Sequence, residues 1–146
     1  MSELVIVHDD NLADRDRRVI LDGLLTFSDA CTKRPRHYRP LQLTMRDRAG
    51  NVAGGVLAAG VWEWLVIDAL WVRSDLRRQG HGRRLMRAAE TAGVAMGCLY
   101  VRLDTFDFEA RGFYERLGYD VYAQLDGFPV GHTQFHLRKR LDGRAK

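Results

Sequence analysis

The feature of this sequence that most restricts its fold is a nine-residue apolar stretch, Trp64–Val72 (WLVIDALWV), which leads into a glycine turn and then a helix. A nearly uninterrupted apolar run of this length predicts a strand that is covered on both faces and is central in its sheet. The turn is Arg77–Gly82 (RRQGHG), and the pattern of residues 82–96 predicts an amphipathic helix that ends at Gly97. A buried strand that turns through glycines into such a helix predicts an α/β protein.

The rest of the chain adds further strands and two helices. Short runs of apolar residues predict strands at Leu4–His8, Leu41–Arg46, Val52–Ala59, Leu99–Asp104, Tyr119–Leu125 and Thr133–Arg140. Helical spacing predicts helices at Ala13–Phe27 and Phe108–Leu117, the second with Asp107 as its N-cap. Gly54 and Gly55 lie inside a predicted strand, which indicates a bulge or a close approach of another group to bare backbone.

Length and composition indicate an ordinary folded protein. The chain has 146 residues, about the length of one domain, so we expect a single domain over residues 1–146. Residues 1–10 lack the segments of a secretion signal, and no run approaches the roughly 18 apolar residues that cross a bilayer, so we expect a cytoplasmic protein with no membrane partner. In that reducing compartment Cys31 and Cys98 are expected to be free thiols.

The charge of the chain favours an anionic partner. The formal net charge is +4, and all but three of the 23 basic residues are arginine. Net charge alone does not separate nucleic acid, a membrane surface and a small phosphorylated ligand. The densest group of arginines surrounds the glycine turn and consists of Arg73, Arg77, Arg78, Arg83, Arg84 and Arg87.

The glycine turn has the architecture of an anion site. Its glycines allow successive N–H groups to point into one concavity, and the first-turn amides of the next helix add donors and the positive end of the helix dipole. A pyrophosphate fits this description. The dinucleotide fingerprint is excluded, because Leu85 stands where a third small residue is needed and residues 98–100 lack the acidic side chain. A P-loop is excluded because Arg83 and Arg84 follow Gly82 in place of lysine and a hydroxyl residue.

Two motifs resemble those of the GNAT superfamily of acyl-CoA-dependent N-acyltransferases. The first is R-x-x-G-x-G, here Arg77, Gly80 and Gly82, which is similar to the family's pyrophosphate loop. The second is EARGFYERLGY, Glu109–Tyr119, which looks like the family's A-x-x-F-Y-E-x-x-G-F motif. The resemblance covers residues 64–141 in detail and the first sixty only in the order of their elements. It implies an α/β domain with a mixed, mostly antiparallel sheet of about seven strands and helices on both faces.

The resemblance also implies roles for individual residues. The backbone of Leu70, Trp71 and Val72 would bind the pantetheine arm of acetyl-CoA in a split between this strand and the strand Leu99–Asp104. Tyr114 matches the tyrosine that stands near the CoA sulfur and protonates the departing thiolate. The pyrophosphate would be held by Arg77, Arg78, Gln79, Gly80, His81, Gly82 and Arg83. Asp107 replaces an asparagine that is common in the family, so the cofactor contact of that side chain is not carried over.

Asp68 is the candidate general base. It is the only charged residue of the apolar stretch, and an ionised carboxylate among apolar groups is costly unless it is paired, which would strengthen it as a base. Strand alternation also predicts that Asp68 shares a face with Leu70 and Val72. Three alternatives stay open: a structural ion pair of Asp68 with an arginine, Glu63 as the base, and proton removal through water.

Trp62, Trp64 and His132 are candidate contacts of the acceptor. The two tryptophans could line an aromatic slot for a small amine, and core packing is the alternative. His132 precedes the last predicted strand, and base, acceptor contact and no role are all open for it. His132 and His136 share strand parity, but no third ligand is in register, so we expect no metal.

The anion turn and the resemblance together predict a transferase, an N-acetyltransferase that passes the acetyl group of acetyl-CoA to a primary amine of a small molecule by direct attack in a ternary complex. A protein lysine or N-terminus is the alternative acceptor. A CoA-binding sensor and a basic nucleic-acid-binding module are the alternatives outside enzymes, and no nucleic-acid motif supports the second of these. Homodimers are common in the family, so a homodimer is a further expectation.

Overall fold

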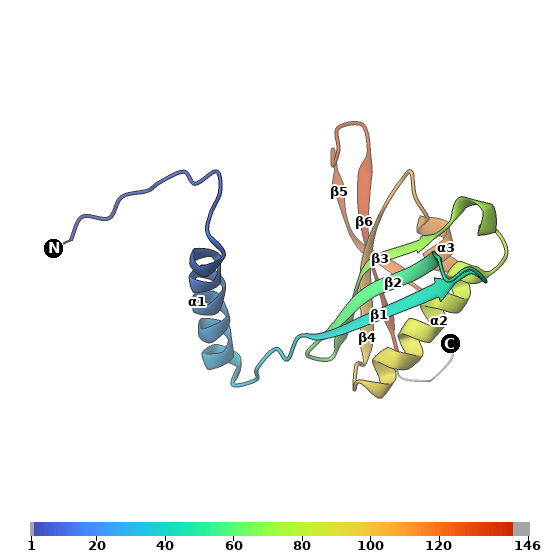
Figure 1. Ribbon diagram of the computed structural model, residues 1–146, viewed down its shortest axis with the longest axis horizontal. Coiled ribbons are helices and arrows are strands. Elements are labelled where there is room, and N and C mark those ends of the chain that lie inside the picture. Colours follow the sequence, from blue (N-terminus) through green and yellow to red (C-terminus); the bar gives the residue numbers. More distant parts are fainter. Residues whose placement is uncertain (1, 142–146) are drawn as a thin grey trace. The chain divides into compact units, whose positions relative to one another are not determined.

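The computed structural model describes residues 2–141 (Figure 1). The chain divides into two compact units, Met1–Arg36 and His37–Lys146. In chain order the elements are α1 (Asp14–Thr32), β1 (Arg39–Arg46), β2 (Val52–Val61), β3 (Trp64–Val72), η1 (Ser74–Leu76), α2 (His81–Ala95), β4 (Tyr100–Phe106), α3 (Arg111–Arg116), β5 (Asp120–Asp126) and β6 (Thr133–Arg140). Within residues 2–141, no helix is long and apolar enough to cross a membrane.

The first unit contains α1, which confirms the helix expected at Ala13–Phe27 and extends it by five residues. Asp14 and Asp16 lie in its first turn, where negative charge complements the positive end of the helix dipole. Lys33 ends the helix in the left-handed conformation (φ 55°), and its N–H donates to the Asp29 carbonyl.

The strand expected at Leu4–His8 is wrong, because these residues form no strand in the structure. A strand exists only where a neighbouring strand supplies backbone hydrogen-bond partners, and an apolar pattern does not specify that neighbour.

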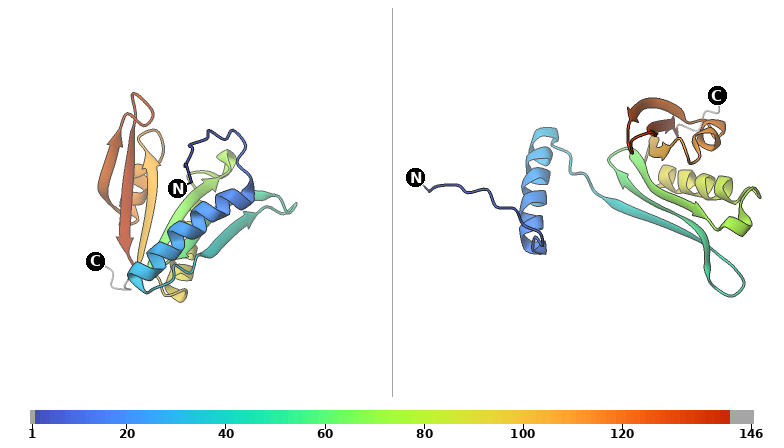
Figure 2. Two further views of the ribbon diagram at one scale, coloured as in Figure 1. Left: turned by 90° about the vertical axis from the view of Figure 1, so that its left-hand side faces the viewer. Right: turned by 90° about the horizontal axis from the view of Figure 1, so that it is seen from above.

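The second unit is built on one sheet with the strand order β1-β2-β3-β4-β6-β5. All neighbours are antiparallel except β3 and β4, which are parallel. The expected α/β class with a mixed, mostly antiparallel sheet is therefore confirmed, with six strands because residues 4–8 do not contribute one. Figures 1 and 2 show that the group β1–β3 and the group β4–β6 diverge from each other.

Helices α2 and α3 pack on one face of this sheet. The buried positions of α2 recur at helical spacing, and Gly97 ends the helix region with φ 87°. The core that the helices share with the sheet includes Leu65, Leu85, Met86, Ala89, Val101, Leu103, Tyr114 and Leu137. Cys98 is also buried there, and burial raises the pKa of its thiol. Cys31, in the first unit, is exposed, and both cysteines are free thiols in the structure.

Gly54 and Gly55 mark close backbone contacts, and a bulge lies directly before them, because Met45 pairs with Gly54 and Arg46 with Val52 and so Ala53 has no partner in β1. A Cβ atom at Gly54 would lie 2.9 Å from the Trp71 carbonyl oxygen, and one at Gly55 would lie 2.6 Å from the Leu43 carbonyl oxygen. Real Cβ atoms do not approach backbone oxygen so closely. The two glycines therefore allow β1, β2 and β3 to lie side by side at this point.

A small charged cluster joins α2 to β6 and to Tyr119, the residue before β5, at the edge of the core. The Lys139 ammonium lies 2.6 Å from Glu90 Oε1, and the Tyr119 hydroxyl donates to the same carboxylate at 3.3 Å. The Glu90 side chain is only 12% exposed. Burial, with the adjacent carboxylate, raises the pKa of Tyr119, so its hydroxyl keeps the donor proton.

We expect Lys139→Met to lower the free energy of unfolding by about 2–3 kcal/mol, because it leaves a largely buried carboxylate without its cation. The double variant Glu90→Gln with Lys139→Met should recover most of that loss, since no unpaired charge remains. Urea unfolding of the two single variants and the double variant measures the coupling. Additive effects in this cycle would contradict the pairing.

Candidate functional site

The second unit opens between its two parallel strands. β3 and β4 pair only over Trp64–Ile67 and Tyr100–Leu103. Beyond these pairs β3 continues to Val72 and β4 to Phe106, and residues 68–72 and 104–106 are not paired with each other. Every second residue of β3 directs its N–H and C=O away from β2 and toward this opening. An extended ligand can therefore add to β3 in the place of the missing strand.

A bulge in β3 marks the point where the opening begins. Leu57 of β2 pairs with Ala69 and Ala58 pairs with Ile67, so Asp68 is left without a partner in the register. The expectation that Asp68 shares a face with Leu70 and Val72 is wrong, because the extra residue reverses the alternation. Asp68 is also exposed, so the buried setting expected for it is absent.

The same bulge corrects the description of β3 itself. The strand is central in the sheet, as expected, and Leu65 and Ile67 are buried beneath α2. Its second half is not covered on both faces, since Ala69 and Trp71 are exposed. The apolar composition of the stretch did not separate its buried half from its open half.

The glycine turn lies between β3 and the start of α2, as the sequence predicts. Arg78 (φ 59°) and Gly80 (φ 84°) both adopt left-handed backbone conformations. The first amides of α2 have no carbonyl of the helix to bond to. The N–H of Arg84 donates to the carbonyl of Gly80, the N-cap, at 3.1 Å. Alternation of left-handed and ordinary conformations before a helix gathers N–H donors into an anion-binding concavity.

Side chains of the turn hold its backbone in place. Arg77 Nε donates to the Val72 carbonyl at the end of β3, at 3.0 Å, and Gln79 Nε2 donates to the Asp75 carbonyl at 3.2 Å. Arg77 thus ties the end of the open strand to the start of the turn.

Gly82, in the first turn of α2, lies against α3. A Cβ atom at Gly82 would be 3.3 Å from Phe113 Cζ, and the backbone of Gly82 is not in the left-handed region. The two glycines of the turn therefore serve different needs. Gly80 supplies a backbone conformation, whereas Gly82 leaves space beside an aromatic ring.

Tyr114 follows Phe113 in α3 and is buried in the core, with 8% of its surface exposed. Its ring makes edge contacts with the rings of Phe113 and Tyr119. Burial, together with the carboxylate of Glu109, raises the pKa of Tyr114 to about 12. The phenol is therefore protonated at neutral pH and is available as a hydrogen-bond donor.

The loop before β6 brings His132 against Asp107. His132 Nδ1 lies 2.9 Å from Asp107 Oδ1, and the other carboxylate oxygen accepts the N–H of Thr133 at 3.1 Å. Asp107 is therefore not the N-cap of α3, and the prediction of that role is wrong. The N-cap is Ala110 and makes no side-chain hydrogen bond. The carboxylate instead fixes the start of β6 to the end of β4.

Trp62 and Trp64 lie at the other end of the paired segment. Trp62 occupies the turn before β3 with φ 50°, and Trp64 stacks on Tyr100 with ring centres 4.7 Å apart. Both precede the bulge at Asp68, whereas His132 lies beyond the end of β4. The structure therefore does not bring the three expected acceptor contacts together.

A second histidine–carboxylate pair was not anticipated from the sequence. Asp104 of β4 and His136 of β6 are opposite each other in the register, and His136 Nδ1 lies 2.6 Å from Asp104 Oδ1. The two residues are 32 positions apart, so only the pairing of β4 with β6 brings them together. Strand alternation in the sequence predicts the face of the sheet on which His136 lies, but it does not predict that Asp104 lies opposite on that face.

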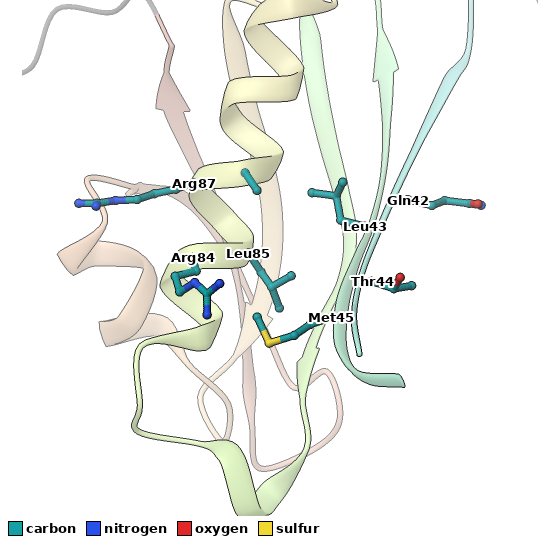
Figure 3. A pocket seen from close by; sticks show the side chains of 8 residues that line it. Gln42, Leu43, Thr44, Met45, Arg84, Leu85 and Arg87 are labelled. Carbon is teal, nitrogen blue, oxygen red and sulfur yellow. The ribbon is translucent and has the colours of Figure 1, made fainter. Parts of the chain in front are cut away.

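A cavity of about 580 Å³ lies elsewhere on the second unit (Figure 3). Its lining comes from β1 and α2 and consists of Gln42, Leu43, Thr44, Met45, Arg84, Leu85, Arg87 and Ala88. None of these residues belongs to β3 or β4, so the cavity is separate from the opening between the strands. Among residues 2–141, no group of three or more histidine, cysteine, aspartate or glutamate side chains is placed to hold a metal ion.

A sheet that opens beside a glycine turn at the start of a helix is suited to an extended ligand that carries a phosphate group. Comparisons with known proteins narrow the class of protein that this arrangement indicates. A sequence model of the Acetyltransferase (GNAT) family matches residues 11–119. The blasticidin-S acetyltransferase of Streptomyces morookaense is 41% identical over 93 residues, which are 63% of this chain and 68% of that protein.

Solved structures agree with the family match. An acetyltransferase from Agrobacterium tumefaciens has a TM-score of 0.86 at 27% identity and covers 94% of this chain and 99% of its own. A streptothricin acetyltransferase from Bacillus anthracis, solved in complex with acetyl coenzyme A, shares the fold with a TM-score of 0.56 at 18% identity, over 62% of this chain and 57% of its own. The chain belongs to the Acetyltransferase (GNAT) family and is an acyltransferase. The match begins at residue 11, well before the region whose motifs indicated the family.

Proposed function

We propose that the protein transfers the acetyl group of acetyl-CoA to a primary amine of a small molecule by direct attack in a ternary complex. The observation that carries the proposal is the opening between β3 and β4 beside the glycine turn. The relationship to blasticidin-S acetyltransferase supports a small aminated acceptor. The family match spans the boundary between the two units, which supports a single functional domain over residues 1–146.

The opening suits the shape of acetyl-CoA. The pantetheine arm is extended and carries amide groups, so it can bond the free edge of β3 along Leu70, Trp71 and Val72 as an added strand would. Its pyrophosphate would then reach the amides of the turn, from Arg78 to Arg83, with Arg77 supporting the turn from the strand end. This arrangement places the thioester near the bulge at Asp68.

Acyl transfer requires charge to be stabilised at two atoms. The amine nitrogen attacks the thioester carbon, so that a C–N bond forms as the C–S bond breaks, and negative charge develops first on the carbonyl oxygen and then on sulfur. A backbone N–H at the free edge of β3 can donate to the oxygen. We assign to Tyr114 the hydrogen bond to the departing sulfur. Because a phenol of pKa about 12 is a weaker acid than a thiol of about 8.5, Tyr114 stabilises the thiolate as a donor before any complete proton transfer.

Asp68 lies where the acceptor must arrive. An exposed carboxylate at the start of the opening attracts an ammonium group and holds it near the thioester. In this proposal Asp68 serves mainly to bring in the cationic acceptor. We expect Asp68→Asn to raise the KM for the amine and to change kcat by a smaller factor, with both constants measured at saturating acetyl-CoA.

The direct test is incubation with acetyl-CoA and a panel of small amines that includes blasticidin S. Release of free CoA thiol and the mass of the acetylated product report turnover, and a boiled sample corrects for hydrolysis. The proposal predicts saturable thiol release with at least one small amine. Release that requires a peptide or protein lysine would overturn the small-molecule assignment, and CoA binding without release from any amine would overturn the enzymatic one.

A further inference from the structure

The paired residues Asp104 and His136 lie where the opening begins. Leu103 is the last residue of β4 that pairs with β3, and Asp104 follows it directly. On β3 the matching position, after Ile67, is the bulge at Asp68. Asp104 and Asp68 therefore lie at the same end of the opening, Asp104 on its β4 side and Asp68 on its β3 side. His136 lies next to Asp104 on β6.

The alternation of β4 and β6 places this pair on the face of the sheet opposite α2 and α3. Leu103 and Thr105 are buried in the helix-covered core, and Asp104 between them is exposed. Likewise Phe135 and Leu137 are buried, and His136 between them keeps 24% of its side chain exposed. Since α2 and α3 cover the other face, we expect the acceptor to reach the opening from the face that carries His136.

The hydrogen bond to Asp104 fixes which nitrogen of His136 can act as a base. Asp104 Oδ1 is 2.6 Å from His136 Nδ1 and 3.6 Å from Arg102 Nη2. A carboxylate accepts hydrogen bonds and does not donate them, so a neutral imidazole bonded to it carries its hydrogen on Nδ1. Nε2 then carries the lone pair.

The charged and titratable groups around His136 come from three strands. Asp104 and Arg102 belong to β4, and Arg138 belongs to β6 and lies over the Tyr122 ring of β5 at 5.2 Å. The Tyr122 ring is 6.1 Å from the imidazole. Of these groups, Asp104 contacts the imidazole directly, and its carboxylate is placed to pair with the imidazolium that forms on proton uptake.

We propose that His136 is the general base of the reaction, and that Asp104 is its positioning residue. The inference rests on the proposed function. The acceptor's ammonium gives one proton to His136 Nε2, and the neutral amine forms the C–N bond as the C–S bond breaks. The second nitrogen proton ends on the CoA sulfur, and the imidazolium returns its proton to solvent, so one proton is released per amide formed.

The test is the pH profile of kcat/KM for the amine in the wild-type protein, His136→Gln and Asp104→Asn. His136→Gln should lose about a hundredfold at pH 7, and its profile should lack the acidic limb of an imidazole. Asp104→Asn should lower kcat/KM about tenfold and shift the acidic limb, because the His136 imidazole is no longer held in one tautomer. The matched control is His132→Gln, which removes the imidazole of the other histidine–carboxylate pair and should retain the limb.

Chemical rescue separates a base from a structural residue. In His136→Ala, added imidazole should restore turnover in proportion to the concentration of its neutral form, and it should not do so in His132→Ala. Thermal unfolding and CoA binding of each variant check that the fold is kept, and ¹⁵N spectra of the wild-type imidazole should show hydrogen on Nδ1.

Two outcomes would overturn the inference. One is an unchanged acidic limb in a folded His136→Gln that binds CoA, and the other is loss of the limb in Asp68→Asn alone. A wild-type protein that acetylates no amine would instead overturn the proposed function, so the two failures are distinguishable.

Discussion

Gly82→Asp should weaken the binding of CoA about thirtyfold more than Gly82→Asn. Both side chains have the same shape and meet Phe113 in the same way, since a Cβ atom at this position would lie 3.3 Å from the Phe113 ring. Only the aspartate places a negative charge beside the amides that are proposed to hold the pyrophosphate. Like charges about 8 Å apart at a protein surface repel by about 2 kcal/mol, which corresponds to the thirtyfold difference.

Two features of the site separate this effect from loss of fold. The backbone of Gly82 is not in the left-handed region, so neither substitution strains it. A carboxylate in the first turn of a helix is favourable, so the free energy of unfolding without ligand should be at least as high for aspartate as for asparagine. Isothermal titration with CoA at two salt concentrations provides the measurement, and the gap between the variants should shrink in high salt. Equal affinities would place the pyrophosphate elsewhere.

The sequence predicted the sheet well where a local pattern is enough. β6 begins and ends at Thr133 and Arg140, as expected, and the hairpin of β1 and β2 lies within two residues of its prediction. The glycine turn was found because an anion site at a helix start requires particular residues in order. In each of these cases the determining interactions lie within a few residues of the chain.

The wrong predictions for the site share one physical cause. The sequence of one strand does not specify how that strand pairs with a distant one. The bulge that exposes Asp68 is set by the register of β2 against β3, and the composition of β3 predicts a uniform strand. Asp107 has the chemistry of an N-cap, yet its carboxylate binds His132 and the Thr133 N–H because the β4–β6 pairing brings them near. The pair of Asp104 and His136 follows from the same pairing.

Tyr114→Phe should lower kcat by about tenfold to a hundredfold and leave the KM for acetyl-CoA nearly unchanged. The hydroxyl is proposed to bond a sulfur that becomes negative only as the C–S bond breaks, and a hydrogen bond to a charged group contributes about 1.5–3 kcal/mol. An interaction made only in the transition state affects kcat and not ground-state binding. Single-turnover measurements should accompany steady-state rates, because slow product release would hide part of the effect.

The raised pKa of Tyr114 also predicts how kcat depends on pH. Because that pKa is raised to about 12, the phenol is still protonated at pH 10, and the wild-type kcat should show no alkaline loss through Tyr114 between pH 7 and 10. Tyr119→Phe is the matched control, because the Tyr119 hydroxyl donates to Glu90 in the core. This variant should lower the free energy of unfolding by about 1 kcal/mol and keep kcat within about twofold of the wild-type value. An alkaline limb near pH 8–9 that disappears in Tyr114→Phe would mean that the bound tyrosine is a much stronger acid, and full proton transfer to sulfur would replace the hydrogen bond as its role.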